Sequence, residues 1–304
     1  INFYKMKPTL LVLAAGMGSR YGGMKQVDPF GPSGETITDY SIYDAIQAGF
    51  GKVVFIIREE FADNFKAIFE PKLAGKIATD YVYQTYDLKP FGMSEEIERA
   101  KPWGTAHAVL AAKDAVKEPF CVINADDFYS RDSYEQMAKF LTSEVTDETY
   151  SLMGFQINKT LSDYGSVSRG VCQVNDAGLL TDIHERTQVY FKNSDVMYEE
   201  NGVEFPLATN TPVSMNFWGF TPKIFEDSVA MFVAFALANK ENPKAEFFIP
   251  LVAENLIKEG KASFKVLPTD SQWFGVTYKE DKPIVQASID ALVTAGVYPS
   301  NLWK

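Results

Sequence analysis

The first half of the chain alternates between short apolar segments and segments of helical length. Thr9–Ala14 and Lys52–Ile57 are mainly apolar runs, as strands are when both faces of a parallel sheet are covered. Asp39–Ala48 lies between them and has helical character, with Asp39 as the expected N-cap. The pattern continues to the strand-like Phe120–Ala125. This alternation predicts a doubly wound α/β fold with a mixed, mostly parallel sheet.

The pattern changes after Tyr150. Strands are expected at Ser151–Ile157, Ser166–Val174 and Val213–Phe220, without regular crossover helices between them. We therefore expect this half to form a more antiparallel lobe appended to the first. The stretch Thr187–Thr211 is long, polar and irregular, which predicts a mobile or lid-like loop.

Composition limits the organisation and the partners of the chain. Of the 304 residues, 46% are hydrophobic, and no linker rich in Pro, Gly or Ser divides them. We expect a single domain, 1–304, with halves at about 8–149 and about 150–295. The net charge of −11 argues against a nucleic-acid partner, which normally requires a basic face. No apolar run reaches the length of a membrane span and no secretory signal is visible, so the sequence predicts a cytoplasmic protein without a membrane partner.

The cysteines and histidines do not form a metal-binding or catalytic motif in the sequence. Cys121 and Cys172 have apolar, strand-like neighbours and no metal-ligand spacing, so both are predicted to be buried thiols. His107 and His184 are the only histidines, which excludes a His-rich zinc site. His107 is expected to be a packed helix residue rather than a catalyst.

A glycine-rich turn follows the first strand directly. Gly16 and Gly18 allow the backbone to turn sharply and to present N–H groups to phosphate oxygens. The third glycine and the later acidic residue of a dinucleotide-binding loop are missing, as is the Gly-Lys-Ser/Thr of a P-loop. The loop carries Arg20 and Lys25 instead. Two cations beside a glycine turn suit a triphosphate whose leaving pyrophosphate gathers negative charge.

These residues resemble the signature of the sugar-phosphate nucleotidyltransferases, the family of glucose-1-phosphate uridylyl- and thymidylyltransferases. The resemblance covers roughly Pro8–Ala295 and is more specific in the first half. It implies that Arg20 contacts the β- and γ-phosphates and that Lys25 contacts the reacting phosphate. It also implies a nucleotide-binding loop formed by Ala14, Ala15, Gly16, Met17 and Gly18.

The same resemblance assigns the base and metal sites. Gly104-Thr105-Ala106-His107-Ala108 is similar to a family segment, and Gln84 ends a strand before it, so Gln84 and Gly104 are the expected contacts of a pyrimidine base. The apolar strand Phe120–Ala125 delivers Asp126 at its end, where open α/β sheets bind ligands. By similarity to the family's aspartate at a strand end, Asp126 is the predicted ligand of Mg²⁺, which prefers oxygen ligands and often takes only one or two carboxylates.

The second half resembles the family's sugar-binding half more loosely. By that similarity Gly165 and Glu185 would contact the sugar ring and Arg186 its phosphate, although Arg186 stands where the family has lysine. The family's second metal-binding aspartate has no counterpart in Gln272–Thr277. Asp281 is expected to be the N-cap of the last helix rather than its substitute.

The sequence therefore predicts Mg²⁺-dependent transfer of a nucleotidyl group from a nucleoside triphosphate, UTP or dTTP being favoured, to a sugar 1-phosphate. Pyrophosphate is released and a nucleotide-sugar is formed. Three alternatives stay open: a cytidylyltransferase acting on a phosphorylated alcohol, a catalytically weak regulatory homologue, and a glycosyltransferase, which would carry an Asp-x-Asp metal motif. Assembly into a homo-oligomer is also left open.

Overall fold

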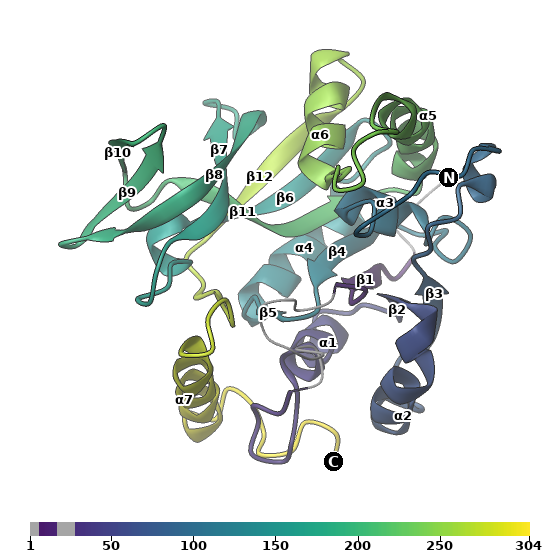
Figure 1. Ribbon diagram of the computed structural model, residues 1–304. Helices are drawn as coiled ribbons and strands as arrows, with labels where there is room; N and C mark the ends of the chain where they lie inside the picture. Colours follow the sequence, from purple (N-terminus) through teal and green to yellow (C-terminus); the bar gives the residue numbers. More distant parts are fainter. Residues whose placement is uncertain (1–5, 17–27) are drawn as a thin grey trace.

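The computed structural model describes residues 6–16 and 28–304, and within them a large mixed sheet of eleven strands forms the centre of the molecule (Figure 1). The main path of the sheet runs in the order β10-β9-β8-β7-β11-β4-β1-β2-β3, and β6 pairs with both β11 and β12. Helices pack on both faces, as in a three-layer α/β protein. The predicted mixed α/β fold class is confirmed.

The first half supplies the parallel part of the sheet. Its strands are β1 (Thr9–Leu13), β2 (Lys52–Ile57), β3 (Ala78–Tyr83) and β4 (Phe120–Asn124). β1 pairs in parallel with both β2 and β4, and β2 with β3. Their carboxyl ends consequently meet at one edge of the sheet.

The helices divide between the two faces. One face is covered by α1 (Ile37–Gln47), α2 (Ala62–Leu73) and α4 (Arg131–Ser143). The other is covered by α3 (Thr105–Leu110), α5 (Lys223–Ala238) and α6 (Ile249–Lys258). Alternate residues of β1 serve the two sides: Leu10 and Val12 join the first core, and Leu11 the second. Burial on both sides explains the continuous apolar run in the sequence.

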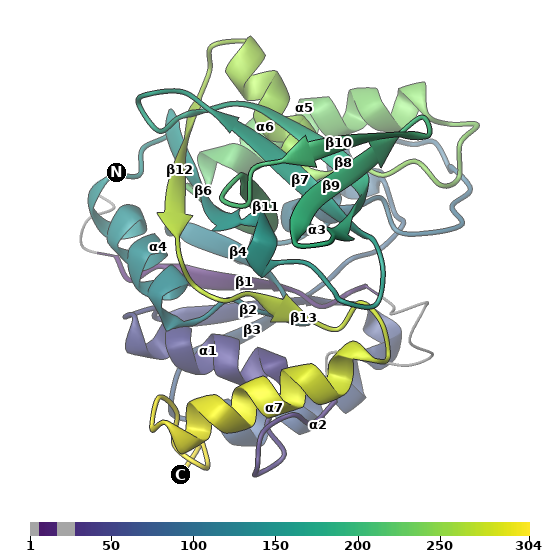
Figure 2. The same cartoon turned by 90° about the vertical axis from the view of Figure 1, so that its left-hand side faces the viewer.

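The last helix, α7 (Asp281–Thr294), lies beside α1 (Figure 2). Ile289 and Val285 of α7 pack with Ile37 and Tyr40 in a third, smaller core. A short β-ladder precedes the helix and links β5 (Asp127–Phe128) to β13 (Phe274–Gly275). The apolar side of the last helix is thus packed against the first half of the chain.

The second half is mainly antiparallel. Its strands are β6 (Thr149–Gln156), β7 (Val167–Val174), β8 (Leu180–Lys192), β9 (Asp195–Glu200), β10 (Val203–Leu207), β11 (Pro212–Phe220) and β12 (Ser263–Thr269). β11 pairs antiparallel with β4, β6 and β7, so this strand joins the two halves. The β6–β12 pair is parallel.

The prediction of a lid-like loop at Thr187–Thr211 is wrong. This stretch forms the end of β8 and all of β9 and β10, which pair as antiparallel hairpins. The strands β8, β9 and β10 form an arm, and most side chains of this stretch are exposed on both faces of the arm. The alternation of apolar and polar residues that marks a half-buried strand is therefore absent. Asn193 and Asn201, both with positive φ, form the tight turns.

Both predicted aspartate caps are also wrong in position. Thr36 is the N-cap of α1, and Asp39 is the third residue of the helix, where its carboxylate accepts from the Thr36 backbone in a capping box. Asp281 is the first residue of α7, and its carboxylate accepts from the backbone N–H groups of Thr277 and Tyr278, at 2.9 and 2.7 Å. It stabilises the turn before the helix rather than the helix itself.

The expectation for the two cysteines holds. Cys121 and Cys172 are buried free thiols, and burial raises the pKa of each. In the described part of the chain, no helix is long and apolar enough to cross a bilayer.

Candidate active site

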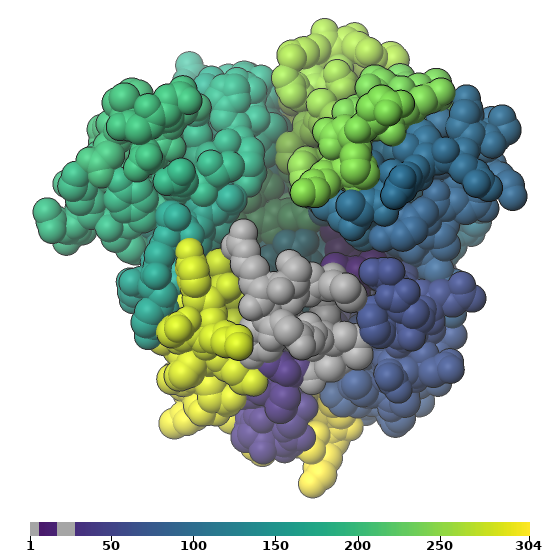
Figure 3. Space-filling view, in the orientation of Figure 1, coloured from purple at the N-terminus to yellow at the C-terminus, as the bar shows by residue number. Residues whose placement is uncertain are grey.

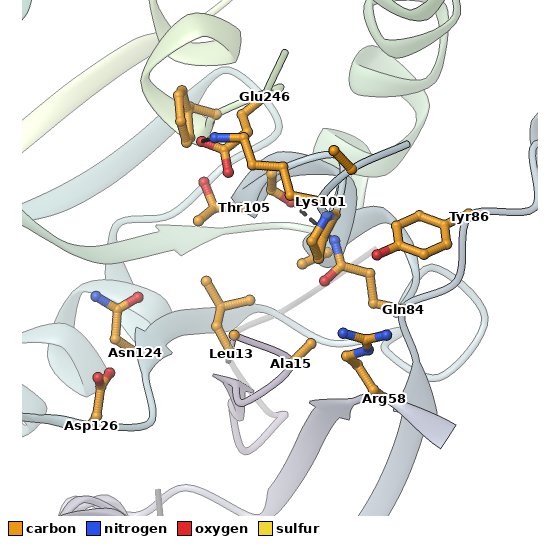
Figure 4. Close-up of a pocket in the computed structure, with 16 residues that line it drawn as sticks. Leu13, Ala15, Arg58, Gln84, Tyr86, Lys101, Thr105, Asn124, Asp126 and Glu246 are labelled. Carbon is orange, nitrogen blue, oxygen red and sulfur yellow. Dashed lines mark hydrogen bonds and ion pairs between the residues drawn. The ribbon is translucent and has the colours of Figure 1, made fainter. Parts of the chain in front are cut away.

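A cleft of about 640 Å³ opens at the carboxyl ends of the parallel strands (Figures 3 and 4). One wall comes from these strand ends. Leu13 ends β1 and Asn124 ends β4, while Ala15, Arg58, Gln84 and Asp126 follow β1, β2, β3 and β4, respectively. The opposite wall comes from the start of α3 and from the segment before α6, with Lys101, Gly104, Thr105, Glu246 and Phe248. In an open α/β sheet this is the position where ligands bind.

The predicted phosphate-binding loop is described only in part. The Ala14 backbone N–H donates to the Ile56 carbonyl at 2.8 Å, which continues the β1–β2 ladder by one residue. Ala15 and Gly16 then line the cleft. Met17, Gly18, Arg20 and Lys25 lie outside the described residues. The described end of the loop therefore enters the cleft from its floor.

The turn after β4 gives its two aspartates different environments. Asp126 lines the cleft. Asp127 is buried, and its Oδ2 accepts from the amide of Asn124 at 2.8 Å and from the Tyr129 hydroxyl at 3.2 Å. Burial and the neighbouring Asp126 raise the pKa of Asp127. Only Asp126 is thus presented to a ligand, while Asp127 holds the turn.

The donor set fits a magnesium ion that takes most of its ligands from substrate and water. Among residues 6–16 and 28–304, no group of three or more His, Cys, Asp or Glu side chains comes together as a metal cage. Asp281 is the other candidate ligand. Its carboxylate accepts from the Thr277 N–H in the turn before α7 and from the Ser162 hydroxyl, which lies at 2.7 Å. Glu246 on the opposite wall pairs with Lys101 at 2.9 Å, which leaves Asp126 as the carboxylate at the strand ends. One carboxylate completed by nucleotide phosphates and waters is a common ligand set for Mg²⁺.

The far end of the cleft holds Gln84 and Gly104. The Gln84 Nε2 lies 3.2 Å from the Gly104 carbonyl oxygen and 3.1 Å from His107 Nδ1. His107 is buried, and burial together with Arg99 lowers its pKa to about 3, so its ring is neutral and Nδ1 accepts. With the amide nitrogen engaged, Gln84 presents its oxygen to the cleft (Figure 4). His107 is a packed helix residue, as expected.

Gly104 has a conformation that requires glycine. Its φ is +107° and its ψ −179°, and a Cβ atom there would lie 2.6 Å from the Phe247 carbonyl oxygen. Phe247 in turn donates its N–H to the Trp103 carbonyl at 2.5 Å and accepts from the Ala106 N–H at 3.0 Å. This close contact joins the two segments that form this wall of the cleft.

A second cavity of about 350 Å³ adjoins the cleft and shares Thr105 and Phe248 with it. We call it the acceptor pocket. Its lining comes from the second half and from α6: Gly170, Ile183, Glu185, Ser214, Asn216, Pro250, Leu251 and Glu254, besides the two shared residues. Burial raises the pKa of Glu185, while Arg169 opposes that shift. Polar groups therefore line a pocket with apolar walls, as in small-molecule sites.

The other two residues predicted for the sugar side lie elsewhere. Arg186 pairs with Glu200 at 2.6 Å, its guanidinium stands over the Tyr198 ring, and it lines neither cavity. Gly165 lies under the ring of Tyr278, whose hydroxyl would be 2.7 Å from an added Cβ, and it lines neither cavity. The structure thus brings Glu185 to the pocket but not Arg186 or Gly165.

Sequence reasoning missed several lining residues. Arg58 and Asn124 stand at the ends of buried parallel strands, so the argument that selected Asp126 applies to them as well. Asn216 and Glu254 had no such signal, because only the path of β11 and the packing of α6 bring them to the acceptor pocket.

The fold and the cleft are those of a ligand-binding α/β protein: parallel strand ends, with Ala15 and Gly16 after β1 and Asp126 after the neighbouring strand β4. The chain belongs to the nucleotidyl transferase family, whose model matches residues 10–281. It is accordingly a nucleotidyltransferase, as the sequence predicted.

Solved structures of similar fold are nucleotidyltransferases of several kinds. Each of the following is 14% identical to this chain. A putative glucose-1-phosphate thymidylyltransferase from Bacillus anthracis has a TM-score of 0.62 and covers 92% of this chain and 94% of its own. The inositol-1-phosphate CTP transferase from T. maritima has a TM-score of 0.60, with 93% and 96% covered. The UTP-bound UGPase from Acinetobacter baumannii has a TM-score of 0.57, with 93% of each covered. No significant match was found among curated proteins.

Proposed function

We propose that the protein transfers a nucleotidyl group from UTP or dTTP to a sugar 1-phosphate, with Mg²⁺ as cofactor and pyrophosphate as the second product. The observation that carries the proposal is the pair of adjoining cavities. The larger holds Asp126 and the described end of the glycine turn, and the smaller holds Glu185. Two substrates bound side by side could then react across the shared residues Thr105 and Phe248. The product would serve nucleotide-sugar biosynthesis.

The reaction needs no covalent enzyme intermediate. An oxygen of the acceptor phosphate attacks the α-phosphorus, and the bond from that phosphorus to the leaving pyrophosphate breaks. Asp126 would hold the metal, which when bound neutralises phosphate charge and orients the reacting groups. Arg20 and Lys25 would neutralise the triphosphate, Gln84 and Gly104 would contact the base, and Glu185 would bind the acceptor's hydroxyl groups. Catalysis is then mainly positioning and charge stabilisation.

Cytidylyl transfer to a phosphorylated alcohol is a second candidate, and the geometry of Gln84 supports it. Because the Gln84 amide nitrogen is engaged by Gly104 and His107, the side chain offers an acceptor oxygen to the base. That oxygen can accept from the N3–H of uracil or thymine, or from the 4-amino group of cytosine. A fold shared with an inositol-1-phosphate CTP transferase is compatible with the second case.

The test is pyrophosphate release from the four ribonucleoside triphosphates and dTTP, each against a panel of sugar 1-phosphates and phosphorylated alcohols. Asp126→Asn should lower kcat by about 100-fold or more with the fold intact, because a bound metal contributes several kcal/mol to the transition state. Asp176→Asn, at an exposed turn, is the matched control and should be silent. Near wild-type turnover of Asp126→Asn at saturating Mg²⁺ would show that the metal assignment is wrong.

A further inference from the structure

Asn216 has an unusual backbone for a strand residue. Its φ is +62°, and of the five non-glycine residues with positive φ in the described part of the chain it is the one that lies within a strand. The side chain costs free energy in this conformation, which persists only where the surroundings impose it. The β11–β6 register shifts between Ser214 and Trp218, so Asn216 sits in a β-bulge.

The bulge lies where the two halves of the sheet separate. Up to Ser214, β11 pairs with β7 of the second half, and from Trp218 onward it pairs with β4 of the nucleotide half. Asn216 is between these two pairings and lines the acceptor pocket. Its side chain also reaches Asn124, at the end of β4, which lines the nucleotide cleft. One side chain therefore touches both halves of the site.

A directed chain of hydrogen bonds runs through Asn216. The Trp218 indole Nε1 donates to the Asn216 Oδ1 at 3.1 Å, and the Asn216 Nδ2 donates to the Asn124 Oδ1 at 2.8 Å. The Asn124 Nδ2 then donates to the Asp127 Oδ2 at 2.8 Å. The Trp218 indole can only donate, so the Asn216 amide must turn its oxygen toward the indole and its nitrogen toward Asn124. The Asn124 amide is oriented in the same way, with its oxygen toward Asn216 and its nitrogen toward Asp127. The chain thus begins at a buried tryptophan and ends at the turn that carries Asp126.

We propose that Asn216 is a positioning residue for nucleotidyl transfer, which holds Asn124 and the Asp126–Asp127 turn in register with an acceptor bound in the adjoining pocket. This rests on the proposed function, because the register matters only if two substrates react across these cavities. On this proposal, the strained backbone of Asn216 is retained because the side-chain amide is needed between Trp218 and Asn124. A residue that only completed the fold would be replaced by glycine without loss of activity.

The test compares Asn216→Gly and Asn216→Asp with wild type, using the best triphosphate and acceptor from the panel. Glycine accepts positive φ without strain, and this gain offsets the loss of the two hydrogen bonds, so the melting temperature of Asn216→Gly should stay close to that of wild type. Its kcat should nevertheless fall about tenfold or more, because Asn124 loses the donor that fixes its side chain, while the triphosphate KM stays within about twofold. Asn216→Asp keeps the acceptor for Trp218 and loses the donor to Asn124, so it should be as defective as glycine.

Asn201→Gly is the matched control, because Asn201 also has positive φ (+54°) and lies in the β9–β10 turn, outside both cavities. It should leave kcat unchanged. Wild-type kcat in Asn216→Gly, or full activity in Asn216→Asp, overturns the inference and leaves the proposed function standing. If wild type itself releases no pyrophosphate with any pair of substrates, the proposed function fails and the inference fails with it.

Discussion

At the scale of single residues, the site uses burial to fix protonation states. His107 packs against Phe91 and Phe232 and has Arg99 nearby, and these surroundings lower its pKa to about 3. The neutral ring accepts from Gln84 and so helps to fix the orientation of the Gln84 amide. A charged imidazolium could not accept that hydrogen bond. The low pKa of His107 therefore goes together with an amide oxygen that faces the cleft.

This arrangement predicts an acid-sensitive stability. Between pH 6.5 and pH 3 the unfolded chain binds a proton at His107 that the folded chain does not, so stability is complete above pH 6.5 and falls as the pH decreases. At pH 5 the loss from this one group should be about 2 kcal/mol. His107→Gln, measured by urea unfolding at pH 7 and pH 5, should remove that part of the pH dependence. His184→Gln, at an exposed side chain paired with Asp182, should not, and equal effects of the two variants would contradict the assignment.

At the scale of elements, the start of α3 is fastened to the segment before α6, and the two together form one wall of the cleft. Gly104 is the residue before the helix, and its backbone contacts that of Phe247 from the segment leading to α6. No side chain fits between them. This explains why a glycine occurs at a helix N-terminus, where Ser, Thr, Asp or Asn is usually preferred.

Gly104→Ala should therefore destabilise the protein by more than positive φ alone requires. Gly178→Ala is the control: its φ is +75° with nothing within 4 Å of an added Cβ, so it should cost about 1–2 kcal/mol. Gly104→Ala should cost a further 1–3 kcal/mol, roughly, because the Cβ would overlap the Phe247 backbone. Urea unfolding measures both. Equal losses would mean that the two segments can separate without cost, and this contact would then not hold the wall of the cleft together.

At the scale of the whole molecule, the two halves line different cavities. The parallel half supplies most of the cleft, and the antiparallel half with α6 supplies most of the acceptor pocket. Neighbouring residues of β8 differ in position: Glu185 lines the acceptor pocket, while Arg186 pairs with Glu200 and packs on Tyr198. The geometry thus favours Glu185 over Arg186 as an acceptor contact.

Steady-state kinetics with both substrates varied will separate these two residues. Glu185→Gln should raise the acceptor's KM by about tenfold, the loss expected for a hydrogen bond to a charged group, and leave the triphosphate KM unchanged. Arg186→Gln should change neither KM by more than about twofold, because exposed ion pairs contribute little. A large rise in the acceptor's KM for Arg186→Gln alone would restore the role that the sequence resemblance implied.

The sequence by itself determined the features that depend on neighbouring residues. The apolar runs of β1, β2 and β4 predicted a parallel sheet because burial on both faces leaves a continuous apolar pattern. The position of Asp126 in the cleft followed from the same strands, since parallel carboxyl ends meet at one edge. The strands of the arm formed by β8, β9 and β10 were not fully predicted, because exposure on both faces removes the alternation of apolar and polar residues on which strand prediction depends.

Only the tertiary structure decided which distant side chains meet. The carboxylate of Asp281 accepts hydrogen bonds from Ser162 and from the turn before α7. The contact between Ser162 and Asp281 spans 119 residues of sequence. Asn216 reaches Asn124 because β11 bulges between two pairings, although nothing in the residues around it indicates a bulge. Arg186 stays outside the acceptor pocket because Glu200 and Tyr198 hold it on the arm. Local patterns report burial and conformation, whereas a binding site is assembled by strand register and helix packing, which depend on the whole chain at once.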